Sequence, residues 1–406
     1  MFGRNLTKEK LIASANYVQA ELPVRLAHRI RDFQRLPYIC GTNPYMGKVY
    51  QLYWNSFDEF RKFKKIETLQ DNSEWCNLMS RNMKEHSQVI PLLGMGVSEC
   101  VGIVDHEAIN SFMNRMLMTR ISRRTLVEQH IMLSENFYNS IDNEIRYTNQ
   151  NTNFGDLRNL FSDNFGTPAH IHSAATTQSS ATSKAQIVGK VDTQCNVASL
   201  VLDIGSKLSS IFEDAYDLVP LTSPQIIIHS PEKVQLMCVT DHIEYILFEI
   251  LKNSIKATIQ TALKNSENDM NPNLQNLDFS PIHVTICQSK TNVTIRISDK
   301  GGGIEKKIYD QLWNYCSSYK AQFLTNFHRV KEMQAKTNEY TGVSPLISLG
   351  FGLPMTRVIA NYWGGEISVF TLPGYGVDTY VKLPRLGNVS ENLASENLDL
   401  EDGSVV

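Results

Sequence analysis

Apolar side chains in the first part of the chain recur at helical spacing, and prolines are few. One run repeats at i, i+1, i+4 and i+5, which places its members on one face of an amphipathic helix. Its members are Phe112, Met113, Met116, Leu117 and Ile121. Several such helices in succession predict a helical bundle, and we assign it to residues 1–185.

From residue 186 the apolar pattern changes to the alternation of half-buried strands, mixed with helical segments. A first hairpin is expected between residues 282–286 and 293–297, and a second around the turn Pro373-Gly374-Tyr375-Gly376. Ile226–Ile228 is a further short strand. Residues 186–386 therefore predict a second domain with a mostly antiparallel sheet, so that the whole chain is α+β.

Two segments are marked by composition alone. Residues 171–185 are rich in Ser, Thr and Ala, which predicts a flexible linker; a low-complexity loop inside one domain is the alternative. Residues 387–406 contain five acidic and no basic residues, which predicts an acidic flexible tail.

Charge and cysteine content exclude several classes of partner. The net charge of −3 gives no reason to expect nucleic acid. Seven scattered cysteines without a CxxC pair argue against a disulfide framework and a zinc site. No apolar run reaches the ~20 residues of a membrane span.

Candidate chemistry begins on the predicted helix 241–260. Glu249, Asn253 and Lys256 are spaced to share one face, and Lys252 lies beside them. The Asn253 amide oxygen suits a hard cation such as Mg²⁺, the carboxylate suits proton transfer, and the lysines suit phosphate. A solvated polar face explains the same pattern when it is taken alone.

Two glycine-containing segments add to this. Asp299 ends the predicted strand 293–297 on its core side and precedes Gly301 and Gly303, which allow close backbone approach. A plain turn is the alternative. Residues 348–353 then lead into a helix expected from Met355 to Trp363, whose free N–H groups suit phosphate.

Together, the polar helix, the strand ending in DxGxG and the later GxG before a helix resemble the GHKL ATP-binding fold. The resemblance implies that ATP is bound, that Asp299 holds adenine, and that residues 304–347 form a lid over the nucleotide.

The helical half also resembles one branch of that superfamily, the mitochondrial 2-oxoacid dehydrogenase kinases. The segments that carry this resemblance are 21–30, 120–130, 188–197, 248–253, 298–304 and 350–354. It implies an N-terminal four-helix bundle before a GHKL α/β sandwich. It also implies phosphorylation of serine on the E1α subunit of pyruvate dehydrogenase, docking on the E2 lipoyl domain, a homodimer or a heterodimer with a paralogue, and the mitochondrial matrix.

The same resemblance assigns roles to individual residues. Glu249 is the expected general base and Asn253 the expected Mg²⁺ ligand. The residues expected to contact the nucleotide are Lys252, Asn253, Lys256, Asp299, Gly301, Gly303, Ser318, Tyr319, Ser348, Leu349, Gly350, Phe351, Gly352 and Leu353.

The chain departs from the family pattern at several positions. Tyr245 stands where a histidine is usual, one turn before Glu249, and a tyrosine does not titrate near neutral pH. Lys256 replaces arginine, Ser348 replaces the first glycine of the loop, and Val377 replaces a threonine.

Three other readings stay open. A protein histidine kinase needs an acceptor histidine followed by an acid and a proline, which none of the ten histidines has. A nucleotide-holding regulator without phosphotransfer is favoured by Tyr245. The branched-chain complex is the alternative substrate. Outside the site, His130 is expected to be a buried structural histidine. Arg25 and Arg29, with Arg31 and Arg35, are expected as charges on the helix surface, and an acid-binding face toward the complex is the alternative.

Overall fold

The computed structural model describes residues 6–100, 103–148, 187–216, 218, 223–231, 234–267, 279–315 and 351–385. Over these residues the chain divides into two compact units, one up to Lys190 and one from Val191 onward. The expected linker 171–185 and tail 387–406, and the site residues Ser318, Tyr319, Ser348, Leu349 and Gly350, lie outside the described residues.

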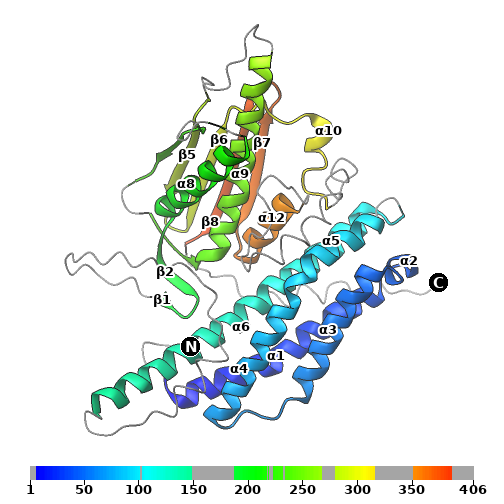
Figure 1. The fold of residues 1–406 in the computed structure, drawn as a ribbon, viewed down its shortest axis with the longest axis vertical. Helices are drawn as coiled ribbons and strands as arrows, with labels where there is room; N and C mark the ends of the chain where they lie inside the picture. The colour runs from blue at the N-terminus through cyan, green and yellow to red at the C-terminus, as the bar shows by residue number, and fades with distance from the viewer. Residues whose placement is uncertain are drawn as a thin grey trace. The chain divides into compact units, whose positions relative to one another are not determined.

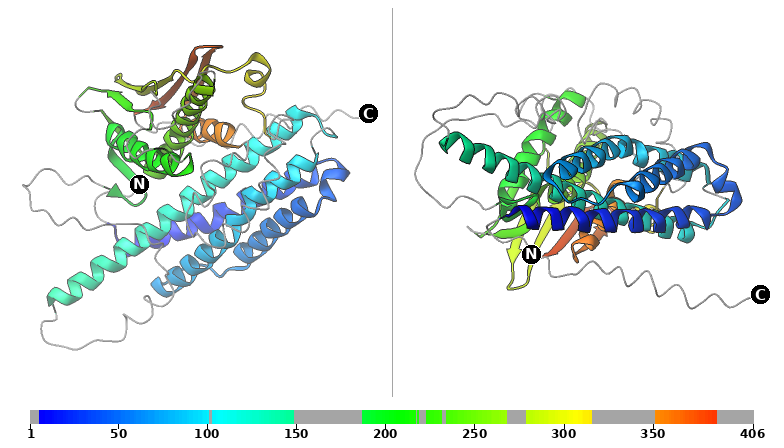
Figure 2. Two further views of the ribbon diagram at one scale, coloured as in Figure 1. Left: turned by 45° about the horizontal axis from the view of Figure 1, so that its top comes forward. Right: turned by 90° about the horizontal axis from the view of Figure 1, so that it is seen from below.

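The first unit is built from helices that run side by side (Figures 1 and 2). Their bounds are α1 Lys8–Gln34, α2 Tyr38–Gly41, α3 Pro44–Lys62, α4 Leu69–Glu85, the 3₁₀ turn η1 His86–Gln88, α5 Val89–Cys100 and α6 His106–Thr148. Since α4, η1 and α5 follow one another without a loop, four long helical stretches pack together, as a four-helix bundle requires.

Local sequence explains where these helices begin. Thr68 precedes α4, where its hydroxyl accepts a hydrogen bond from the backbone N–H of Asp71 and its own backbone N–H donates to the Asp71 carboxylate. This reciprocal capping box satisfies two backbone donors that the first turn leaves unbonded. At the start of α3 the Asn43 side-chain oxygen accepts hydrogen bonds from the backbone N–H groups of Tyr45 and Met46, and Pro44 takes the first helical position.

The core of the bundle confirms the helical rhythm and corrects one expectation. The five apolar residues of the run Phe112 to Ile121 are all buried. Arg25 and Arg29, expected on the surface, are also buried, with 3% and 1% of their surface exposed. Because α1 packs against α3, α4 and α6, these guanidinium groups fall inside the bundle, where Glu21 and Asp32 form ion pairs with them.

His130 is the buried structural histidine that its apolar surroundings predict. Its Nδ1 lies 3.0 Å from the Ser14 hydroxyl and its Nε2 lies 2.9 Å from the Asn72 side-chain oxygen. Burial lowers its pKa to about 4, so the imidazole is neutral at physiological pH.

The second unit contains a five-stranded sheet, a small second sheet and three longer helices (Figure 1). Its strands are β2 Val191–Asn196, β3 Ile226–His229, β4 Gln235–Val239, β5 Ile282–Gln288, β6 Asn292–Asp299, β7 Glu366–Leu372 and β8 Gly376–Pro384, with β1 Ile187–Val188 just before the boundary. Its helices are α8 Val197–Ala215, α9 Thr240–Glu267, α10 Lys306–Tyr309 and α12 Gly352–Tyr362.

The large sheet has the strand order β3-β5-β6-β8-β7. Only β3 and β5 pair in parallel; the other three pairs are antiparallel, which confirms the mostly antiparallel sheet and both predicted hairpins. Strand β2 pairs with β4 in the small sheet. Both β5 and β6 alternate buried and more exposed residues, so one face of the large sheet forms the core beneath α8, α9 and α12.

Helix α12 begins at Gly352, three residues earlier than expected, and includes Pro354 in its first turn. A first-turn proline is tolerated because the N–H that it lacks would have no helical partner there. The helix ends as predicted: Gly364 adopts φ +71° directly after it, and the Gly365 N–H returns to the Ala360 carbonyl at 2.8 Å.

Candidate nucleotide site

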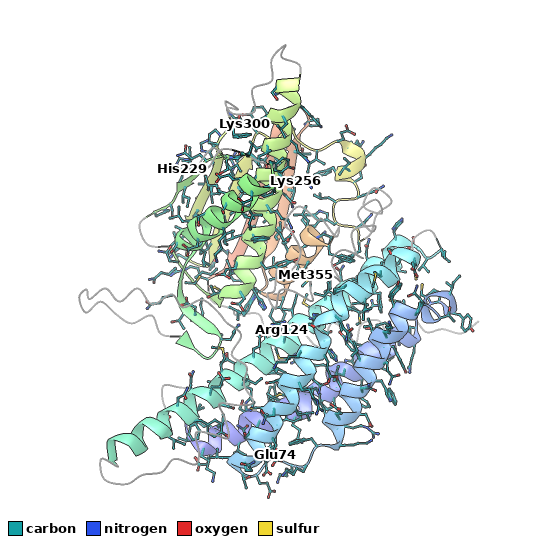
Figure 3. All side chains as sticks on the ribbon, viewed as in Figure 1. Glu74, Arg124, His229, Lys256, Lys300 and Met355 are labelled. Atoms are coloured by element: carbon teal, nitrogen blue, oxygen red, sulfur yellow. The ribbon has the colours of Figure 1, made fainter. Side chains whose placement is uncertain are left out.

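Helix α9 carries four of the residues singled out from the sequence, and Figure 3 labels one of them, Lys256. Glu249 and Lys252 are buried, whereas Asn253 is exposed. The Lys252 ammonium donates to both carboxylate oxygens of Glu249 at 2.6 Å. Lys252 is therefore the direct partner of the expected base. The helical spacing that places Glu249, Asn253 and Lys256 on one face did not predict this contact.

Asp299 occupies the last position of β6, on the buried face of the sheet. Its Oδ2 accepts a hydrogen bond from the Ser254 hydroxyl at 2.8 Å, and its Oδ1 accepts one from the Gly301 N–H at 2.9 Å. Burial raises the pKa of Asp299, and these bonds, with one from the Val377 backbone, oppose the rise. The site thus holds a carboxylate with fixed orientation and spare acceptor capacity.

Ser254 is a site residue that the sequence reasoning missed. It follows Asn253 on α9 and is buried, and its hydroxyl joins this helix to the end of β6. The sequence carried one indication of this contact. The in–out alternation of side chains along β6 places Asp299 on the face of the sheet against which a helix must pack.

Gly301 and Gly303 have specific steric reasons to be glycines. A Cβ at Gly301 would lie 2.5 Å from the Ala257 Cβ, and a Cβ at Gly303, where φ is +75°, would overlap the Leu372 carbonyl oxygen. The Thr261 hydroxyl donates to the Gly301 carbonyl at 2.9 Å. Both glycines thus allow close contact with other parts of the protein: Gly301 with α9, and Gly303 with the β7–β8 turn. These contacts fix the loop that follows Asp299.

Gly352 brings the start of α12 against the expected base. A Cβ at this position would overlap Glu249 Oε2. Leu353 follows in the first turn of α12, and the free N–H groups and positive dipole end of that turn thus lie beside the Glu249–Lys252 pair. Segments about 100 residues apart in the sequence meet here, and a helix N-terminus of this kind favours anions.

Aromatic contacts join the residues on either side of the undescribed segment 316–350. The Tyr315 and Phe351 rings lie 5.6 Å apart, and the Arg357 guanidinium lies 5.0 Å from the centre of the Trp313 ring. Phe351 is buried by this contact. Sequence reasoning included Phe351 only as part of the loop, because its aromatic partner lies far away in the chain.

Two shifted groups flank the pair on α9. Burial lowers the pKa of Lys256, and the charge of Lys252 adds to that effect. Burial raises the pKa of Tyr245 well above its ordinary value, and the nearby Glu249 carboxylate adds to that. The phenol next to the expected base is therefore neutral at physiological pH. Val377, a further departure from the family pattern, lies on β8 and pairs with Asp299 on β6.

In the described parts of the chain no helix is long and apolar enough to cross a bilayer. The same residues contain no group of three or more His, Cys, Asp or Glu side chains able to hold a metal ion. A cation held by one amide oxygen and by phosphates needs no such group.

Two family models match the chain. Residues 1–157 match the model described as mitochondrial branched-chain alpha-ketoacid dehydrogenase kinase. Residues 238–387 match the model described as histidine kinase-, DNA gyrase B-, and HSP90-like ATPase. The two matches fall on the bundle and on the unit that contains Glu249 and Asp299.

Similar proteins cover almost the whole chain. A mitochondrial [pyruvate dehydrogenase (acetyl-transferring)] kinase 2 from Saccharomyces cerevisiae is 25% identical over 97% of this chain and 80% of its own. The corresponding kinase from Arabidopsis thaliana is 25% identical over 97% and 90%. Isozyme 3 from Mus musculus is 28% identical over 96% and 80%.

Proposed function

The chain belongs to the family of mitochondrial 2-oxoacid dehydrogenase kinases within the GHKL superfamily, and from this premise we propose its reaction and substrate. It is an ATP-using kinase that transfers the γ-phosphate to a serine of the pyruvate dehydrogenase E1α subunit and thereby inactivates that complex. The observation that carries the proposal is the meeting of Glu249, Lys252 and the N-terminus of α12 on the same helix whose Ser254 hydroxyl holds Asp299.

The site divides into a base-binding end and a phosphate end. Asp299, oriented by Ser254 and Gly301, accepts the exocyclic amine of adenine. Lys252, Lys256 and the N–H groups at the start of α12 stabilise the phosphates, since cations and helix N-termini both favour anions. The loop residues Ser348, Leu349 and Gly350, and the pair Ser318 and Tyr319, complete the nucleotide contacts in this proposal.

The exposed amide of Asn253 would hold Mg²⁺, which takes oxygen ligands and few protein groups when phosphates supply the others. When bound, the ion neutralises phosphate charge. The chain's own residues fit this arrangement, because the neighbouring carboxylate and lysines leave Asn253 as the accessible neutral oxygen donor on this face of α9.

Glu249 acts as the general base that accepts the proton of the serine hydroxyl. In the free protein its carboxylate is held by Lys252, so its orientation is fixed before substrates bind. The phosphates of ATP compete for the same ammonium. As Lys252 turns toward them, the Glu249 carboxylate loses its partner and is free to accept a hydrogen bond from the serine hydroxyl.

Two alternatives have specific support. The bundle matches a model named for branched-chain dehydrogenase kinases, which favours the branched-chain E1 as substrate. The neutral Tyr245 phenol favours a nucleotide-holding regulator, because it cannot tune Glu249 as a titrating histidine would. The names of the similar proteins, which span the whole chain, support the pyruvate complex.

Partners and place follow from the same proposal. Residues 1–185 contain the bundle that docks on the E2 lipoyl domain, and residues 186–386 contain the ATP-binding domain. The protein is mitochondrial, as its named relatives are, and we place it in the matrix. There it works as a homodimer or as a heterodimer with a paralogue.

The substrate assignment is tested by supplying purified pyruvate and branched-chain E1, each with its E2, and [γ-³²P]ATP. We expect label on a serine of the pyruvate E1α. Preferential labelling of the branched-chain E1 would replace the proposed substrate, and failure to label either protein while ATP still binds would favour the regulator.

A further inference from the structure

Two histidines face each other on the large sheet, away from the nucleotide site. His229 ends β3, and His283 lies near the start of β5. The His229 Nε2 and the His283 Nδ1 share a hydrogen bond at 3.2 Å, in place of whose proton an ion could bind, and the two rings are inclined by only 14° with centroids 5.5 Å apart. His229 is exposed and His283 is half-buried, so solvent reaches the pair. Figure 3 labels His229 on this edge of the sheet.

The register of β3 and β5 explains why the rings meet. Ile227 pairs with His283, and His229 pairs with Thr285, so both histidines belong to the residues that alternate with the buried set. They therefore lie on the face of the sheet opposite the core. Asp299 is on the buried face, and its neighbour Ser298 is the residue that pairs with His283 on β6. The sheet itself thus separates the histidine pair from the Asp299 carboxylate.

Imidazole nitrogens at this separation suit a shared metal ion. Two nitrogens that each lie ~2.0–2.1 Å from one tetrahedral ion are ~3.3 Å from each other. We propose that His229 and His283 form a binding site for a divalent transition-metal ion such as Cu²⁺ or Zn²⁺, with water in the remaining positions. Mg²⁺ and Ca²⁺ are excluded from it because they take oxygen ligands.

Such an ion would join an edge strand to the sheet. Among the strands that the structure describes, β3 is the outermost of the large sheet and pairs with β5 alone. An ion held by one residue from each strand binds the folded arrangement and not the unfolded chain, in which the two histidines are 54 residues apart. Binding is therefore expected to raise the midpoint of thermal unfolding as the metal concentration rises.

The test uses the full chain, freed of metal with a chelator, and CuCl₂ or ZnCl₂ alone as the probe. Copper affinity is measured by titration, and the coordinating nitrogens are counted from the hyperfine pattern of the electron paramagnetic resonance spectrum. The variants are His229→Ala and His283→Ala. His106→Ala is the matched control, because His106 is exposed as His229 is but lies at the start of α6 and not on the large sheet.

We expect a spectrum with two nitrogen ligands and one bound copper ion. Each site variant should weaken binding by at least about tenfold, since even second-shell partners alter metal affinity ~10–100-fold. The control should bind copper as the native chain does, and the zinc-dependent rise in unfolding temperature should disappear in both site variants. Equal copper affinity in all four proteins, or no stoichiometric binding by the native chain, would overturn the proposal. Neither readout depends on kinase activity.

Discussion

Lys252 and Glu249, one turn apart on α9, form a buried ion pair in which the lysine donates to both carboxylate oxygens at 2.6 Å. Only about a tenth of either side chain is exposed, so solvent screens this pair weakly. Gly352 lies directly against the Glu249 carboxylate on the other side. The expected base is thus held between a cation and a helix N-terminus, and each of these contacts can be changed separately.

Replacing Lys252 by Met should destabilise the protein, because it leaves the Glu249 carboxylate buried without its partner. We expect a loss of about 3 kcal/mol in the free energy of unfolding, at the low end for a broken buried pair. The double variant Lys252→Met/Glu249→Gln should recover most of that loss, since no charge remains buried. Urea unfolding of the native protein, Lys252→Met, Glu249→Gln and the double variant measures the coupling, and additive losses would show that the pair is not coupled.

Asp299→Asn should weaken ATP binding, because it removes the charge on the acceptor proposed for the adenine amine. Hydrogen bonds to charged groups contribute ~1.5–3 kcal/mol, so we expect a roughly 10- to 100-fold rise in the ATP dissociation constant. Asp378→Asn is the matched control, since Asp378 pairs with Arg296 on the opposite face of the sheet. Calorimetric titration with ATP measures the dissociation constant of each protein. An unchanged ATP affinity in Asp299→Asn would refute the role of Asp299 in binding adenine.

The raised pKa of Asp299 also predicts how stability changes with pH. The folded protein holds a proton on Asp299 more tightly than the unfolded chain does, so this group favours folding most below its unfolded pKa. That contribution is lost as pH rises through the folded pKa. The stability of the native protein relative to Asp299→Asn should therefore fall as pH increases from the acid range toward neutrality. Urea unfolding of both proteins at several pH values measures this difference in the free energy of unfolding. A native protein that gains stability relative to Asp299→Asn as pH increases would contradict the raised pKa of Asp299.

Gly352→Ala should disturb the start of α12, since the new Cβ would overlap Glu249 Oε2. Overpacking of this kind costs ~1–3 kcal/mol, and displacement of the carboxylate should lower the rate of phosphotransfer more than it lowers ATP affinity. Gly47→Ala is the control: it lies in the helix α3 with no atom within 4 Å of the new Cβ, and it should stabilise by up to ~1 kcal/mol. Equal kinetics in native and Gly352→Ala protein would show that the contact has no catalytic role.

Local patterns in the sequence were enough to predict both hairpins. The alternation of Ile282, Val284 and Ile286 reflects a period of two that any half-buried strand must show, and all three are buried. Residues 316–350 and their predicted roles lie outside the described residues, so that part of the site remains a prediction.

Contacts between distant segments could not be predicted in the same way. Ser254 meets Asp299 only because α9 packs over the end of β6, and Gly352 meets Glu249 only because α12 packs beside α9. Arg25 and Arg29 were misassigned for the same reason. A helical spacing shows which residues share a face, but not how many neighbours enclose the helix, and α1 is enclosed by three.

The most direct test of the account is a single-turnover measurement of γ-phosphate transfer from ATP to pyruvate dehydrogenase E1α, with ATP affinity measured in parallel. We predict transfer by the native chain. We also predict a loss of at least about 100-fold in the rate for Glu249→Gln, the scale of general-base catalysis, while ATP still binds. Native-like transfer by Glu249→Gln would contradict the role of this carboxylate, and ATP binding without transfer by the native chain would contradict the kinase itself.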